Sequence, residues 1–180
     1  MNWNLTTRRA FSRLAAVLLA FGMAAVSAAP GADGRIYLNA DAPRYSNGRY
    51  GFSITLPAGQ WEVVEADNGD GITAKDDESD PKSREIRVWG TRSYSVLGQD
   101  FAAALAEAEG DFASIARREA DAAAGHFTLA GTAKTGGLLY VRCFFDKEVA
   151  NIARITAPDG WQAGFDAAVR AVESSFKPGF

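Results

Sequence analysis

Apolar and polar residues alternate in the stretch YSNGRYGFSITLP (45–57), where every second position from Tyr50 to Leu56 is apolar. A period of two places alternate side chains on opposite faces of a strand, so the pattern predicts a half-buried strand. A Ser-Asn-Gly turn precedes this strand and a proline ends it. Similar short apolar runs between turn residues predict strands at 35–38, 61–64 (a return strand), 72–75, 84–90, 127–133, 138–146 and 149–157.

The run LLYVRCFF (138–145) is apolar on both faces apart from Arg142. Such a run is typical of a central strand that is covered on both sides of the sheet. Gly136 and Gly137 separate it from the strand before it, which predicts an antiparallel pair joined by a tight turn.

Helical spacing replaces the alternation between Asp100 and Gly125. Asp100 can cap a run whose apolar residues share one side over 101–108. Asp111 can cap a second run of this kind over 112–116, and Gly125 ends the segment. One bent helix and two separate helices both satisfy this pattern.

A longer helix is predicted at the C-terminus. Apolar residues recur there at spacings of four, four, three and four, at Trp161, Phe165, Val169, Val172 and Phe176. This spacing forms one apolar face of a helix, on which we expect Trp161 to pack into the core. Asp159 is the expected N-cap, and Pro178 follows the helix.

Together these elements predict an α+β fold, with a largely antiparallel β-sheet flanked by helices and the C-terminal amphipathic helix packed on the sheet. The chain has 180 residues, of which 47% are hydrophobic and 23% charged, an ordinary composition for a folded domain. A chain of this length has room for one domain.

The first 28 residues are predicted to be a secretory signal peptide. Arg8, Arg9 and Arg13 form a basic start, and an apolar run over 14–26 follows. Small residues precede a cleavage position after Ala28. The apolar run is shorter than the roughly 20 residues that span a bilayer, although an N-terminal anchor is the alternative if cleavage does not occur.

Within this leader, the stretch TRRAFSR resembles the twin-arginine export motif. Arg8, Arg9 and Phe11 match the motif, whereas Ser12 and Arg13 stand where it has Leu and Lys. Paired arginines also occur in ordinary leaders, so both the twin-arginine and the general secretory route stay open.

The chain is therefore expected to comprise a signal peptide (1–28), an extended segment (29–43) and a single α/β domain (44–177). We expect a periplasmic or secreted protein without a stable membrane anchor after cleavage. The leader carries three of the 19 basic residues and none of the 22 acidic ones, so its removal changes the formal net charge from −3 to −6. An acidic chain without a basic run is a poor nucleic-acid binder.

Several motifs carry a resemblance to a known family. They are YSNGRYGFSITLPAGQW, NGDG, REIRVWG followed by a helix, LLYVRCFF, NIARITAP and FDAAVRAVESSF. Over Tyr45 to Phe176 the chain resembles the PsbP-like superfamily of α/β/α sandwiches, as a small secreted bacterial member. The superfamily includes a photosystem subunit and a Ran-binding release factor, and the resemblance implies a binding or scaffolding role, with no catalytic residues to carry over.

Residues with reactive side chains are few. His126 is the single histidine and Cys143 the single cysteine, so no internal disulfide can form. We interpret His126 as a residue at a helix-to-strand junction, and Cys143 as a small buried hydrophobe within LLYVRCFF. The acidic segment 67–80 lacks the ligand spacing of a calcium loop and is read as solvated, although a weak calcium site there stays open. We expect no cofactor and no catalytic or metal site.

Among the aromatic residues, Trp89 and Tyr94 flank the polar 91–95 loop and are the candidates for an exposed partner contact. The leading hypothesis is an exported, non-catalytic envelope module that binds another envelope protein. The alternatives are a small-molecule or lipid carrier with an apolar cavity, and a hydrolase with a carboxylate site that the sequence hides.

Overall fold

The structure is a computed structural model that describes residues 36–40, 43–76, 83–146 and 148–179. The predicted leader, with Arg8, Arg9, Phe11 and Ala28, lies outside these residues. In chain order the elements are β1 (Ile36–Ala40), β2 (Arg44–Asn47), β3 (Phe52–Thr55), β4 (Gly59–Glu65), β5 (Gly71–Lys75), β6 (Glu85–Thr91), α1 (Ser93–Val96), α2 (Phe101–Glu109), β7 (Phe112–Asp121), β8 (His126–Ala133), β9 (Leu138–Phe145), β10 (Ala150–Ala157), α3 (Gln162–Ser175) and β11 (Lys177–Pro178).

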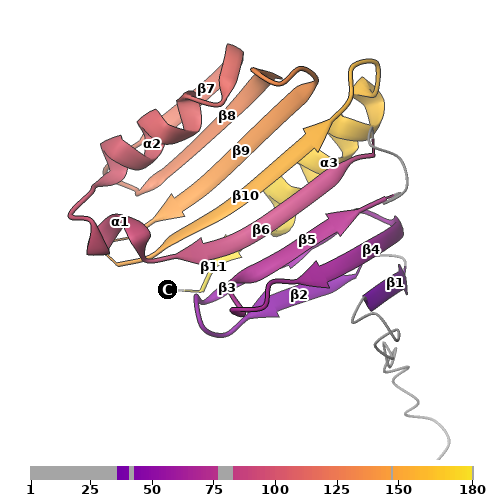
Figure 1. Cartoon of the computed structure of the whole chain (residues 1–180), viewed down its shortest axis with the longest axis horizontal. Coiled ribbons are helices and arrows are strands. Elements are labelled where there is room, and N and C mark those ends of the chain that lie inside the picture. The colour runs from indigo at the N-terminus through magenta and orange to yellow at the C-terminus, as the bar shows by residue number, and fades with distance from the viewer. Residues whose placement is uncertain (1–35, 41–42, 77–82, 147, 180) are drawn as a thin grey trace, which may run out of the picture.

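Two sheets account for all of these strands. Within the described ranges, the large sheet has eight strands in the order β1–β4–β5–β6–β10–β9–β8–β7. Each neighbouring pair in it is antiparallel. In the small sheet β3 lies between β2 and β11, and α2 and α3 lie on opposite faces of the large sheet (Figure 1). The predicted fold class, an antiparallel sheet flanked by helices, is confirmed.

Strand β9 is buried on both faces, as its apolar sequence predicts. Tyr140 belongs to the core on the α3 face, whereas Val141 and Cys143 belong to the core on the α2 face. Tyr140 lies opposite Ile155 of β10 in the register, and both pack in the α3-face core. Because successive side chains of β9 point to opposite faces, this central strand needs a covering layer on each side of the sheet.

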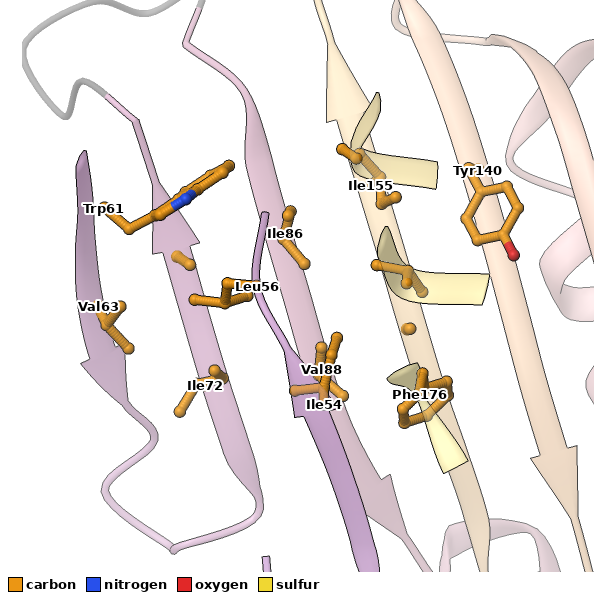
Figure 2. Packing of buried hydrophobic residues seen from close by; sticks show 14 of the residues in the cluster. Ile54, Leu56, Trp61, Val63, Ile72, Ile86, Val88, Tyr140, Ile155 and Phe176 are labelled. Atoms are coloured by element: carbon orange, nitrogen blue, oxygen red, sulfur yellow. The ribbon is translucent and has the colours of Figure 1, made fainter. Parts of the chain in front are cut away.

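The core on the α3 face joins the large sheet, the small sheet and the helix. Ile54 of β3 lies close to Val88 of β6 (Figure 2). Phe176, directly after α3, has its ring centroid 5.9 Å from that of Phe52 and 5.5 Å from that of Phe144. Edge-to-face and tilted ring contacts at this range stabilise a core beyond their buried area.

On the opposite face, α2 packs over the strands β8 and β9. The ring of Phe101 lies 5.8 Å from that of Phe127 and 6.3 Å from that of Phe145. The helix begins as predicted, because the side chain of Asp100 accepts a hydrogen bond of 3.1 Å from the backbone N–H of Ala103.

The predicted helix after Asp111 is wrong, since this segment is the edge strand β7. Its register with β8 shifts between Phe112 and Ser114 and again between Ile115 and Arg117. Each bulge inserts an extra residue into the strand, so the apolar positions lose their period of two. Phe112 and Ile115 consequently lie three residues apart in the sequence, which is also the spacing of a helical face.

The expected start of the C-terminal helix is also wrong. The helix begins at Gln162 with Trp161 in the N-cap position, and no side chain caps this end, so Asp159 does not serve as the cap. Trp161 is 45% exposed, whereas Phe165 is buried as predicted. The guanidinium carbon of Arg84 lies 5.6 Å from the ring centroid of Trp161, a cation–π contact at the surface.

Two alanine substitutions distinguish these roles. Phe165→Ala removes a buried ring and should lower the free energy of unfolding by about 3 to 5 kcal/mol. Trp161→Ala removes an exposed ring in a cation–π contact and should cost about 1 kcal/mol or less. Urea unfolding followed by far-ultraviolet circular dichroism measures both, and equal losses would contradict the assignment of Trp161 to the surface.

Candidate functional site

A half-open pocket lies between α2 and the large sheet. Its cavity volume is about 90 Å³. The lining side chains come from β6, α1, α2, the turn after α2, and strands β8 to β10. Segments far apart in the sequence thus meet at this one place because β6, β10, β9 and β8 are consecutive strands of the sheet.

The floor of the pocket is apolar. Val141 and Cys143 alternate on β9 with residues that face the α3 side of the sheet, and Ile152 lies opposite Cys143 on β10. The roof is α2, which presents Ala104 and Ala108 to the pocket. Because these two side chains are methyl groups, the helix covers the sheet without filling the space beneath it.

The rim of the pocket carries charge. Arg154 of β10 donates a hydrogen bond of 2.5 Å to the carboxylate of Asp111, which lies in the turn after α2. Glu107 of α2 is exposed and bonds the hydroxyl of Tyr94. Burial and this bond together raise the pKa of Tyr94 well above its ordinary value, so the phenol stays protonated.

The structure places both predicted contact residues, Trp89 and Tyr94, in the lining of this pocket. Trp89 is half-buried, with the guanidinium carbon of Arg87 at 4.8 Å from its ring centroid. The expectation that Tyr94 is exposed is wrong, because α1 turns its ring inward to 5.9 Å from that of Phe145. Whether Trp89 and Tyr94 contact a partner stays a prediction.

Two exposed apolar residues were missed by the sequence reasoning. Val96 is 79% exposed and Leu97 is 68% exposed; Val96 is the last residue of α1 and Leu97 follows it. A pair of aliphatic residues that belongs to no predicted strand or helix, just before Gly98, is a sequence signal that could have found them.

The two reactive side chains lie on opposite faces of the sheet. In the register of β8 with β9, His126 lies opposite Phe144, whereas Phe127 lies opposite Cys143. Cys143 is fully buried, and burial raises the pKa of its thiol to about 12. The thiol is therefore protonated at neutral pH, which does not favour nucleophilic chemistry.

The described part of the acidic segment is held by arginines. Arg49 pairs with Asp70 at 3.1 Å, and Arg84 pairs with Asp76 at 2.7 Å. Asp77, Glu78 and Asp80 lie outside the described residues. Among the residues that the structure describes, no group of three or more His, Cys, Asp or Glu side chains is placed to hold a metal ion.

A comparison with solved structures finds the same architecture elsewhere. The chain is similar to the solution structure of cyanobacterial PsbP (CyanoP) from Synechocystis sp. PCC 6803. The match has a TM-score of 0.50 at 14% sequence identity and covers 76% of this chain and 92% of that chain. The chain has a PsbP-like fold.

This similarity confirms the resemblance of the sequence to PsbP-like proteins. At 14% identity it shows the PsbP-like fold alone. No family model and no curated protein matches the sequence. In the described part of the PsbP-like fold, no helix is long and apolar enough to cross a membrane.

The buried thiol beneath the pocket predicts a pH dependence. The folded state holds Cys143 protonated up to about pH 12, whereas an unfolded thiol ionises near pH ~8.5. The thiol therefore makes its full contribution to the free energy of unfolding below about pH 8.5. Above this pH the free energy of unfolding falls, by up to about 1.4 kcal/mol per pH unit. Denaturant titrations between pH 8 and 11 measure this slope.

The variant Cys143→Ala is the control for this measurement. It lacks the thiol, so its free energy of unfolding should fall less steeply between pH 8 and 11, although its value at pH 7 is lower because a cavity remains. Equal slopes for the two proteins would exclude the thiol as the source of the alkaline loss.

Proposed function

We propose that this chain is an exported, non-catalytic module of the cell envelope or periplasm that binds or scaffolds another protein. The observation that carries the proposal is the exposed pair Val96–Leu97 beside the pocket that Trp89 and Tyr94 line. Aliphatic side chains that remain exposed next to a half-open apolar hollow favour a protein contact. We call the surface formed by α1, α2 and this pocket the α1–α2 surface.

The packing of the remaining chemical groups supports a non-catalytic role. Cys143 and His126 are separated by the sheet, and Asp111 is paired with Arg154. A nucleophile needs a base within hydrogen-bonding reach, and this geometry keeps the two candidate residues apart.

The two alternative functions receive less support. A carrier needs a cavity that encloses most of its ligand, typically about 300 to 1,000 Å³, whereas this pocket measures about 90 Å³. A hydrolase needs two free carboxylates that converge on one substrate bond. Around the pocket, one of the two carboxylates is engaged by Arg154 and the other bonds Tyr94.

Export from the cytoplasm is the part of the proposal that rests on the leader. We expect the chain to be recovered from the periplasmic or secreted fraction at the size that cleavage after Ala28 produces. Replacing Arg8 and Arg9 by Lys should abolish this recovery if the twin-arginine pathway carries the protein, and unchanged recovery assigns the general route. Full-length protein retained in the cytoplasm of the parent strain would contradict export.

A site-specific crosslink tests the partner contact. A photoreactive phenylalanine analogue at Leu97, in the full-length chain expressed in its own host, should yield a discrete crosslinked species on irradiation. The matched control carries the analogue at the exposed Thr135, which lies at the opposite end of β9 from α1. Species at both positions, or at neither, would contradict a partner on the α1–α2 surface.

A further inference from the structure

The small size of the pocket favours a small branched group over a ring. Its cavity volume is about 90 Å³. The branched end of a leucine or valine side chain has three carbon atoms and is of this size. A benzene ring, by comparison, occupies an engineered apolar cavity of about 150 Å³.

The lining determines which kind of group is favoured. The floor residues Val141, Cys143 and Ile152 offer an apolar surface, and the protonated thiol behaves as a small hydrophobe. An aliphatic group that displaces poorly ordered water from such a floor gains affinity, whereas a polar group would lose its own hydration.

Acidic side chains outnumber basic ones in the lining of the pocket, which contains Glu107, Asp111 and Arg154. Residues 93–116, which include α1 and α2, contain Asp100, Glu107, Glu109 and Asp111 but no Lys, Arg or His. Arg118 pairs with Glu109 and Arg154 pairs with Asp111. Within the described part of the chain, Glu107 at the rim and Asp100 at the helix start have no cationic partner, so this surface attracts positive charge.

We propose that the partner docks a basic segment on the α1–α2 surface, with one leucine or valine side chain inserted in the pocket and an adjacent lysine or arginine paired with Glu107. This inference rests on the protein-binding function proposed above and names the chemistry of the partner. The aliphatic anchor supplies the affinity and the basic neighbour supplies the orientation and the rate of association.

A peptide series tests the proposal on the exported, mature protein. The reference is a labelled hexapeptide with one leucine between lysines. It is compared with peptides that carry phenylalanine, alanine or aspartate in place of the leucine. A further peptide keeps the leucine but has glutamates in place of the lysines. Fluorescence anisotropy should show the lysine-flanked leucine peptide binding at least about tenfold more tightly than each of the others. Its affinity should fall as salt is added.

Two pairs of variants locate the binding site. Ala108→Leu fills the pocket and should weaken the leucine peptide at least about tenfold, whereas Ala106→Leu adds the same side chain at an exposed position of the same helix and should leave binding unchanged. Glu107→Gln should weaken binding about threefold to tenfold and reduce its salt dependence, whereas Asp159→Asn, on an exposed loop before α3, should change neither.

Three outcomes would overturn the inference: equal binding of the phenylalanine peptide, equal binding of the glutamate-flanked peptide, or unchanged binding by both Ala108→Leu and Glu107→Gln. The peptide comparison uses the unaltered protein, so it decides the matter even if Ala108→Leu does not fold. A crosslink at Leu97 together with a failed peptide series would overturn the partner's chemistry but keep the proposed function. No crosslink at Leu97 would overturn that function itself.

Discussion

Burial of both faces of β9 and β10 is the constraint on which the rest of the structure depends. Neighbouring residues on these strands point to opposite sides, so Tyr140 and Val141 require two separate cores. Each apolar face is stabilised only if another layer removes it from water, at about 25 cal/mol per Å². The helix α3 with the small sheet provides one layer, and α1 with α2 provides the other.

The candidate site exists because the second layer, α1 with α2, does not fill all of the space above the sheet. α2 meets the sheet through alanines such as Ala104 and Ala108, which leave a hollow above Cys143. The short α1 turns Tyr94 into that hollow, whereas Val96 at its C-terminal end and Leu97 after it are exposed to solvent. One local conformation therefore both buries the predicted aromatic residue and exposes the aliphatic pair that supports the proposed function.

The separation of His126 from Cys143 follows from strand geometry. His126 and Cys143 are brought to adjacent strands, yet the register places them one position apart and so on opposite faces. On the α3 face, the polar side chains instead join layers: Arg117 of β7 donates a hydrogen bond of 2.6 Å to Glu173 of α3. Tyr140 bonds the same carboxylate. This network connects the edge strand to the helix that covers its neighbours.

The sequence by itself determined the strands with a regular period, the cap at Asp100, the double burial of β9 and the inert character of Cys143, because these depend on local periodicity and composition. Only the tertiary structure decided that β3 and the strand after it belong to different sheets, that the bulged segment 112–121 is an edge strand, and that Trp161 is exposed. It also decided that Trp89 and Tyr94 share a pocket with Glu107. The reason is physical: a period identifies which residues need burial, whereas the layer that buries them, and the gaps it leaves, come from segments distant in the chain.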